Sequence, residues 1–135
     1  MAISSCLCQA LKIEIPGRPM AAALCHCSDC RKISGGAFGF NWVVALKDVE
    51  ITGIPKTFST TANSGNTVTS HFCNNCGVTL WRDGPASDGL MYLKAGTLDD
   101  FNDQKLVTPM AEIFVSKRLS WLGPVPGAAQ KLEMK

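Results

Sequence analysis

Short runs in which apolar and polar residues alternate recur along the chain and predict β-strands. The run from Lys12 to Ile15, for example, alternates and stops at Pro16-Gly17. Gly, Pro, Asn and Asp separate most of the runs, as is typical of turns between strands. The strands expected on this basis cover 12–15, 39–46, 49–52, 56–59, 67–72, 78–81, 90–94 and 111–115.

Helical patterns are scarce. One turn is expected at 29–33 and another at 99–105, where Asp99 or Asp100 would serve as the N-cap. Neither segment is long enough to be a stable helix without packing against the rest of the protein. The chain is therefore expected to be mainly β, with little helix.

The sequence contains no internal repeat and no convincing linker, so we expect one domain over residues 1–122. Pro124, Pro126 and Gly127 interrupt the remaining stretch. Residues 123–135 are accordingly expected to form a poorly ordered C-terminal extension.

Composition narrows the class of protein. The 135 residues are 46% hydrophobic and 18% charged, with a formal net charge of +2, which is ordinary for a globular domain. The basic residues are dispersed, so no nucleic-acid partner is expected. No apolar run suits a signal peptide or a membrane span, and we expect a cytoplasmic protein without a membrane partner. The expected partner is a small-molecule substrate, and the sequence leaves the oligomeric state open.

The seven cysteines fall into three short motifs, and none lies elsewhere. In a reducing compartment such clustering indicates metal binding or catalysis rather than disulfides. The motifs are Cys6-Leu7-Cys8, Cys25-His26-Cys27-Ser28-Asp29-Cys30 and Cys73-Asn74-Asn75-Cys76-Gly77.

The third motif has the shape of a zinc knuckle, in which a glycine lets the backbone turn and aim N–H groups at two sulfurs. A closed zinc site is tetrahedral and needs four ligands. The first motif, Cys6-Leu7-Cys8, is the natural source of the other two ligands. The expected structural zinc site consists of Cys6, Cys8, Cys73 and Cys76.

The middle motif provides three thiolates, Cys25, Cys27 and Cys30, within six residues. Three protein ligands and one exchangeable position are the usual arrangement of a catalytic zinc. His26 would point the other way in an extended segment, although a closed site with His26 as fourth ligand stays open as an alternative. A redox pair and a metal-transfer site are further alternatives.

Residues near this motif are candidates for substrate contact. Gly35 and Gly36 follow it in a glycine-rich stretch whose backbone N–H groups could approach a ligand, and Phe38 could line an apolar pocket. Candidates for acid–base work are His26, His71, Asp29 and Glu112.

The ordered motifs Cys-x-Cys, Cys-His-Cys-x-x-Cys-Arg-Lys-x-Ser-Gly and Phe-Cys-x-x-Cys-Gly resemble the glutathione-dependent formaldehyde-activating enzyme family, whose domain a centromere-associated protein shares. The resemblance runs from about Ser4 to Trp121. Gln9 follows Cys8 where the family commonly has glycine. The resemblance implies an Mss4-like fold of several small coiled antiparallel sheets. It also implies a structural zinc on the four-cysteine set and a catalytic zinc on Cys25, Cys27 and Cys30.

The activity that the resemblance implies is carbon–sulfur lyase chemistry, which joins glutathione to formaldehyde. Three thiolates make zinc soft, which independently favours a thiol such as glutathione as co-substrate. An isomerase, cyclase or ring-opening enzyme that uses zinc as a Lewis acid is one alternative. A non-catalytic zinc module that binds a protein partner is another.

Overall fold

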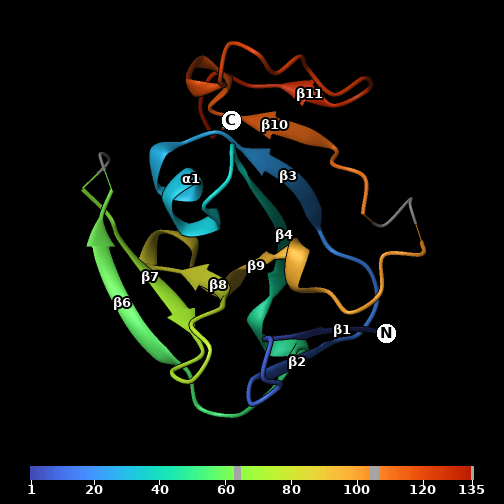
Figure 1. Cartoon of the computed structure of the whole chain (residues 1–135), viewed down its shortest axis with the longest axis vertical. Helices are drawn as coiled ribbons and strands as arrows, with labels where there is room; N and C mark the ends of the chain where they lie inside the picture. The colour runs from blue at the N-terminus through green and yellow to red at the C-terminus, as the bar shows by residue number, and fades with distance from the viewer. Residues whose placement is uncertain (63–64, 104–106, 135) are drawn as a thin grey trace.

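The computed structural model describes residues 1–62, 65–103 and 107–134 (Figure 1). Within these residues the chain forms eleven strands and one α-helix. The strands are β1 (Ala2–Ser5), β2 (Lys12–Ile15), β3 (Ala21–Cys25), β4 (Gly39–Ala45), β5 (Glu50–Thr52), β6 (Lys56–Thr61), β7 (Thr67–Phe72), β8 (Thr79–Asp83), β9 (Leu90–Lys94), β10 (Ala111–Ile113) and β11 (Ala129–Gln130). The helix is α1 (Ser28–Ser34), and the short 3-10 turns are η1 (Leu46–Asp48), η2 (Pro85–Ser87), η3 (Ala95–Thr97) and η4 (Val115–Lys117).

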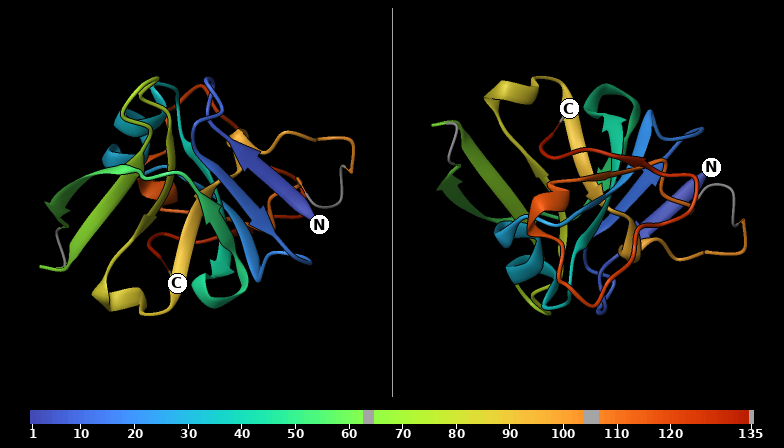
Figure 2. Two further views of the ribbon diagram at one scale, coloured as in Figure 1. Left: turned by 90° about the horizontal axis from the view of Figure 1, so that it is seen from below. Right: turned by 90° about the horizontal axis from the view of Figure 1, so that it is seen from above.

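The strands build two sheets. The smaller has the order β1-β2-β5 and the larger the order β11-β10-β3-β4-β9-β8-β7-β6. Most neighbours are antiparallel, but β10 runs parallel to both β3 and β11. The larger sheet curves strongly, and the smaller sheet lies against one of its sides (Figures 1 and 2). The expected mainly β, cysteine-rich fold is thus confirmed, with one sheet larger than expected and partly parallel.

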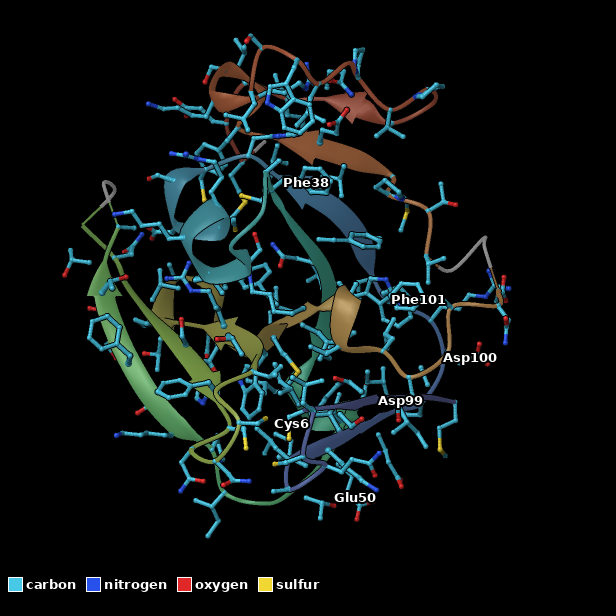
Figure 3. All side chains as sticks on the ribbon, in the orientation of Figure 1. Cys6, Phe38, Glu50, Asp99, Asp100 and Phe101 are labelled. Atoms are coloured by element: carbon cyan, nitrogen blue, oxygen red, sulfur yellow. The ribbon has the colours of Figure 1, made fainter. Side chains whose placement is uncertain are left out.

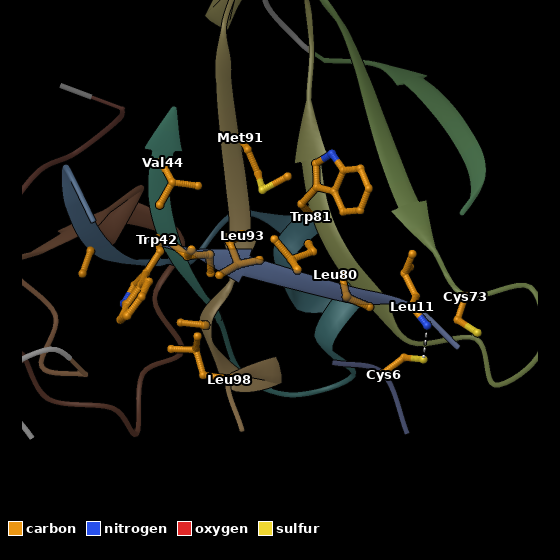
Figure 4. Packing of buried hydrophobic residues seen from close by; sticks show 14 residues of the cluster. Cys6, Leu11, Trp42, Val44, Cys73, Leu80, Trp81, Met91, Leu93 and Leu98 are labelled. Atoms are coloured by element: carbon orange, nitrogen blue, oxygen red, sulfur yellow. Dashed lines mark hydrogen bonds between the residues drawn. The ribbon is translucent and has the colours of Figure 1, made fainter. Parts of the chain in front are cut away.

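The hydrophobic core lies between the two sheets (Figure 4). The register of the large sheet puts Trp42, Leu93 and Trp81 side by side on one face, where they pack with Ile13 and Leu11 of the N-terminal segment. Residues one position away along β4 and β9 point to the other face, because side chains alternate along a strand. The large sheet therefore has a core face and an outer face.

The predicted strands are confirmed to within a few residues, whereas β1, β3 and β11 were not predicted. The helix expected at 29–33 is α1, but the turn expected at 99–105 is wrong for its described part, 99–103, which is not helical. The Asp99 N–H instead bonds the Ile3 carbonyl, and the Asp100 carboxylate accepts from the Asn102 N–H. Such local side-chain bonds compete with a helix. Residues 104–105 lie outside the described part.

The C-terminal segment is packed, contrary to the expected poorly ordered extension. Residues 129–130 form β11, the Ala129 N–H donates to the Met110 carbonyl and the Lys131 N–H donates to the Glu112 carbonyl. The Val125 N–H donates to the buried Glu112 carboxylate at 2.8 Å. Because Pro124 and Pro126 interrupt only the approach to β11, they do not prevent this pairing.

In the described part of the chain, no helix is both long and apolar enough to cross a membrane.

Candidate metal centres

The four-cysteine cluster joins the two sheets. Cys6 and Cys8 follow β1 of the small sheet, and Cys73 and Cys76 lie in the turn between β7 and β8 of the large sheet. Their four Sγ atoms all lie within 4.8 Å of one another. The Sγ atoms of Cys6 and Cys8 are 3.7 Å apart, and those of Cys8 and Cys73 are 3.5 Å apart. The pairing of the first and third motifs is therefore present in the structure.

Backbone N–H groups point at these sulfurs. The Leu11 N–H approaches Cys6 Sγ at 3.4 Å, and the N–H groups of Asn75 and Cys76 approach Cys73 Sγ at 3.4 and 3.5 Å. The pKa of Cys76 is lowered to about 6, first by a hydrogen bond from the Val78 backbone. Burial raises the pKa of Cys6. Donors of this kind stabilise thiolates, the form of cysteine that binds a metal.

The arrangement fits zinc. Four sulfurs at ~2.3 Å from a tetrahedral zinc ion are ~3.8 Å apart, close to the separations found here. The set consists of four soft thiolate donors, which is a preferred environment of zinc in structural sites. Gly77, at a φ of +81°, reverses the chain immediately after Cys76, and its N–H bonds the Cys73 carbonyl at 2.9 Å.

The second cluster contains three cysteines. Cys25 ends β3, Cys27 is the N-cap of α1, and Cys30 lies buried in the first turn of that helix. The Sγ atoms of Cys25 and Cys27 are 3.3 Å apart, and all three lie within 4.8 Å of one another. Cys27 Sγ also accepts the Cys30 N–H at 3.4 Å, so one thiol serves both the cluster and the helix end. No further His, Cys, Asp or Glu ligand atom joins this group within the described residues.

Side chains of the outer face of the sheet surround Cys30. Asn41 Nδ2 lies 3.9 Å and Lys94 Nζ 4.0 Å from Cys30 Sγ, and Lys94 Nζ donates to Asn41 Oδ1 at 3.0 Å. Helix α1 approaches β4 at Gly39. A Cβ at this position would lie 3.0 Å from Cys30 Cβ and 3.3 Å from its Sγ. The glycine therefore allows the helix to bring Cys30 against the sheet.

Crowding of the three sulfurs makes their protonation strongly unequal. The pKa of Cys30 is lowered to about 2, first by hydrogen bonds from Cys25 and Cys27 and also by the charge of Lys94. The pKa of Cys25 is raised far above its usual range, first because its thiol donates to Cys27. Three thiolates in such a small space need a cation to be charged together, and a metal ion is the cation that thiolates prefer. The donor set thus fits a soft ion such as zinc.

His26 and Glu112 meet in a buried network. His26 Nε2 lies 2.8 Å from Glu112 Oε1, and each side chain is only 1% exposed. Glu112 Oε2 also accepts from Gln130 Nε2 at 2.7 Å and from Arg118 at 3.2 Å. Burial raises the pKa of Glu112, but the bonds from Gln130, Val125 and His26 and the charge of Arg118 outweigh it and lower the pKa to about 2. The structure brings these two predicted residues together beside the three-cysteine loop.

His71 is not near the three-cysteine cluster. It pairs with Trp81 across the sheet, so it lies on the same face as Trp42, opposite to Asn41 and Lys94. Its Nε2 lies 2.8 Å from Asp83 Oδ1, and its ring stacks on Trp81 with the centroids 4.3 Å apart.

The glycine-rich stretch ends the helix. Gly35, at a φ of +69°, is the C-cap of α1, and its N–H bonds the Arg31 carbonyl at 2.8 Å. The Gly36 N–H bonds Ser34 Oγ at 3.1 Å. The Phe38 ring packs against His26, with the centroids 5.6 Å apart, and Figure 3 shows it where α1, β4 and β10 meet. Substrate contact by these three residues stays a prediction.

Sequence reasoning missed Asn41 and Lys94 as neighbours of the cluster. Both are single polar residues within apolar strands, at 39–45 and 90–94. The signal in the sequence was a polar residue next to a buried position of an otherwise apolar strand, on the face opposite to Trp42 and Leu93. Two surface hollows, of about 310 and 440 Å³, lie elsewhere, beside η2 and beside Cys6. Neither is lined by a cysteine of the second cluster.

Comparisons with known proteins agree with this architecture. The fold resembles the crystal structure of a Rhodobacter sphaeroides protein solved as a structural-genomics target, with a TM-score of 0.59 and 18% sequence identity over 79% of this chain and 96% of that one. No curated protein sequence matches the chain. A sequence model described as glutathione-dependent formaldehyde-activating enzyme matches residues 1–117, which include all seven cysteines. Because this match spans most of the chain, the protein belongs to the glutathione-dependent formaldehyde-activating enzyme family.

Proposed function

We propose that the protein is a zinc-dependent enzyme of the carbon–sulfur lyase type, which joins a small thiol to a carbonyl compound and separates them again. Glutathione and formaldehyde are the proposed substrates, in line with the family name. The observation that carries the proposal is the difference between the two sulfur clusters. One offers four thiolates, while the other offers three and is bordered by Asn41 and Lys94.

Cys25, Cys27 and Cys30 would hold the zinc ion, which would supply a soft Lewis acid for a further ligand such as a substrate sulfur. The protein side chains supply the rest of the environment. Lys94 Nζ, 4.0 Å from Cys30 Sγ, balances negative charge near the sulfurs. Asn41 Oδ1 holds that ammonium group in place at 3.0 Å.

The proposed reaction needs no oxidant. The substrate sulfur forms a bond to the carbonyl carbon, the π electrons of the C=O bond move to oxygen, and that oxygen takes up a proton while the thiol loses one. The reverse reaction breaks the C–S bond. The chain contributes chiefly by orienting two small molecules, which lowers the entropic part of the barrier.

His26 and Glu112 are proposed as positioning residues rather than as groups that touch the substrate. Each is 1% exposed, and each uses its partner as a hydrogen-bonding group. His26 sits between Cys25 and Cys27, so fixing its ring fixes the backbone between two sulfur donors. The bonds from Gln130 and Val125 to Glu112 link this loop to the C-terminal segment.

The test is native mass spectrometry of the zinc-loaded protein with and without glutathione, combined with NMR of ¹³C-formaldehyde exchange in the presence of glutathione. We expect two zinc ions per chain, one of which responds to the thiol, and faster exchange than in a protein-free sample. Cys27→Ser is the matched control, because serine keeps the N-cap of α1 and removes the thiolate. It should bind one zinc and show no acceleration. A wild-type protein whose zinc ions both ignore glutathione would overturn the proposal.

A further inference from the structure

Two cations lie on the outer face of the large sheet, beside the three-cysteine cluster. Lys94 of β9 pairs with Asn41 of β4, and Arg82 of β8 pairs with Tyr92, which lies two residues before Lys94 on the same strand. Arg82 and Lys94 therefore share a face as diagonal neighbours on adjacent strands. Both side chains are largely buried, and their two positive charges repel each other.

Arg82 is bound to the protein through only part of its guanidinium group. Its Nε donates to Ser70 Oγ at 3.1 Å, and its Nη2 donates to Thr60 Oγ1 at 3.4 Å. An arginine has five N–H donors in a planar fork that matches a carboxylate. Within the described residues Nη1 has no hydrogen-bond acceptor. Two donors of the fork are thus left for a ligand.

The ion pair between Arg82 and its acidic partner is weak. The carboxylate of Asp29 on α1 lies 3.6 Å from Nη2, beyond the ~2.7–2.9 Å of a close charged hydrogen bond. The Asp29 side chain is 47% exposed, so water and ions compete for it. Asp29 immediately precedes Cys30, and this pair therefore places the guanidinium group near the sulfur cluster.

Lys94 also has one N–H donor that the described part of the protein does not use. An ammonium group has three donors. One bonds Asn41 Oδ1 at 3.0 Å, and a second points to Cys30 Sγ at 4.0 Å. The third has no acceptor among the described residues, and it lies on the same face of the sheet as Arg82.

From this arrangement we infer that Arg82 and Lys94 form a carboxylate-binding subsite, so that the enzyme selects thiols that carry a carboxylate group. This inference rests on the proposed function, because the thiol of the same molecule would occupy the open position of the three-cysteine site. The substrate carboxylate would take the place of Asp29 at Arg82. A purely structural role for the two cations explains their bonds to Ser70, Thr60 and Asn41, but it leaves the open side of the guanidinium fork without a use.

The test compares three probes by isothermal titration calorimetry on the zinc-loaded protein. Glutathione carries both a thiol and carboxylates, its diethyl ester keeps the thiol but loses the carboxylate charges, and S-methylglutathione keeps the carboxylates but loses the free thiol. We expect the diethyl ester to bind ~10–100-fold more weakly than glutathione, the usual effect of losing a hydrogen-bonded charge. S-methylglutathione should also bind more weakly.

Arg82→Gln should weaken glutathione binding ~10-fold or more while leaving binding of the diethyl ester unchanged, and Lys94→Gln should weaken binding of glutathione more than binding of the diethyl ester. Arg82→Lys keeps the charge and should retain part of the preference for the acid. Because Arg82 is buried and could be needed for folding, Lys94→Gln and Arg82→Lys carry the test if Arg82→Gln does not fold. Lys32→Gln, an exposed residue of α1, is the control for a general loss of positive charge and should preserve the preference.

The outcomes separate the two proposals. If glutathione and its diethyl ester bind the wild-type protein equally, the carboxylate subsite is refuted, and the proposed function still stands provided that S-methylglutathione binds weakly. If the preference for the acid survives in both Arg82→Lys and Lys94→Gln at full size, the subsite lies elsewhere and the inference is wrong. If none of the three probes binds, the proposed function fails, and the inference fails with it.

Discussion

The two sulfur clusters are built from the same side chain but surrounded in different ways. Around the four-cysteine cluster, backbone N–H groups of Leu11, Asn75 and Cys76 approach the sulfurs. Around the three-cysteine cluster the Cys30 N–H approaches Cys27 Sγ, and the side chains of Asn41 and Lys94 approach Cys30 Sγ. Backbone donors from the turns that carry the ligands suit a closed site, whereas the side chains of β4 and β9 beside Cys30 border the position that the proposed substrate would share. The difference teaches that the surroundings of a cysteine cluster, as well as the number of cysteines, bear on the structural and reactive roles proposed for the two sites.

The largest contrast is expected between Cys73→Ala and Cys27→Ser. Loss of a ligand from the four-cysteine site should remove a metal that joins both sheets, at a cost of more than ~5 kcal/mol, because structural zinc contributes ~10–16 kcal/mol to small zinc domains. Cys27→Ser should keep the fold and lose the second zinc and the activity. Circular dichroism during heating, together with zinc content, measures both. Equal destabilisation by the two variants would remove the distinction between the sites.

Glu112→Gln tests how the three-cysteine loop is held. Loss of a buried charge that accepts several hydrogen bonds should cost ~2–4 kcal/mol at pH 7, measured by denaturant unfolding at fixed zinc. The exposed Glu14→Gln is the control and should change stability by less than ~0.5 kcal/mol.

The contribution of the Glu112 carboxylate to stability should depend on pH. The folded pKa of Glu112, about 2, is below its ordinary value of 4.5, so its contribution is fully present above pH 4.5 and is lost as the pH falls toward 2. The difference in stability between wild type and Glu112→Gln should therefore shrink by ~3 kcal/mol across this window. A constant difference between pH 6 and pH 3 would show that the carboxylate charge is not responsible.

Gly39→Ala tests the close approach of α1 to the sheet. The new Cβ would lie 3.0 Å from Cys30 Cβ, so the helix must shift, at a cost of ~1–3 kcal/mol. We expect weaker zinc binding at the three-cysteine site and unchanged binding at the four-cysteine site. Competition with a coloured chelator measures both affinities. Gly36→Ala meets only Ser34 Oγ at 3.7 Å and is the matched control. Similar zinc affinities in the two variants would contradict the proposed packing role.

The smallest effect is expected in the loop of the four-cysteine site. Gln9 has a φ of +65°, a left-handed conformation that costs a residue with a Cβ ~1 kcal/mol or more. Gln9→Gly should therefore raise the free energy of unfolding by ~0.5–1 kcal/mol, as determined by calorimetry. Gln9→Ala keeps the unfavourable conformation and should show no gain. Equal stabilisation by both would point to the glutamine side chain instead.

The sequence alone predicted the features that depend on local spacing. The cysteine motifs predicted both clusters, and alternation predicted strands such as 12–15 and 90–94. It missed β3, whose Ala-rich sequence has no alternating pattern and which is stabilised by pairing with β4 and β10. It also missed β11, because a two-residue strand is defined only by its partner.

The environment of the second site was less predictable for a related reason. Lys94 and Arg82 come near Cys30 and Asp29 only because β9 and β8 follow β4 in the sheet order, a property of the topology that no local pattern encodes. His26 and Glu112 were chosen separately as acid–base candidates, and the pairing that makes them neighbours across 86 residues could not be read from either motif.

The parallel pairing of β10 with β3 and β11 has a consequence for the order in which the protein matures. All four ligands of the first cluster exist once residue 76 has been synthesised, whereas the network that holds the three-cysteine loop needs Gln130. Domains begin to fold while the chain is still emerging from the ribosome. The four-cysteine site is therefore expected to be complete on the nascent chain before the network that holds the three-cysteine loop can form. In the proposed enzyme, assembly in this order forms the reactive metal position only when the segments that hold its loop are present.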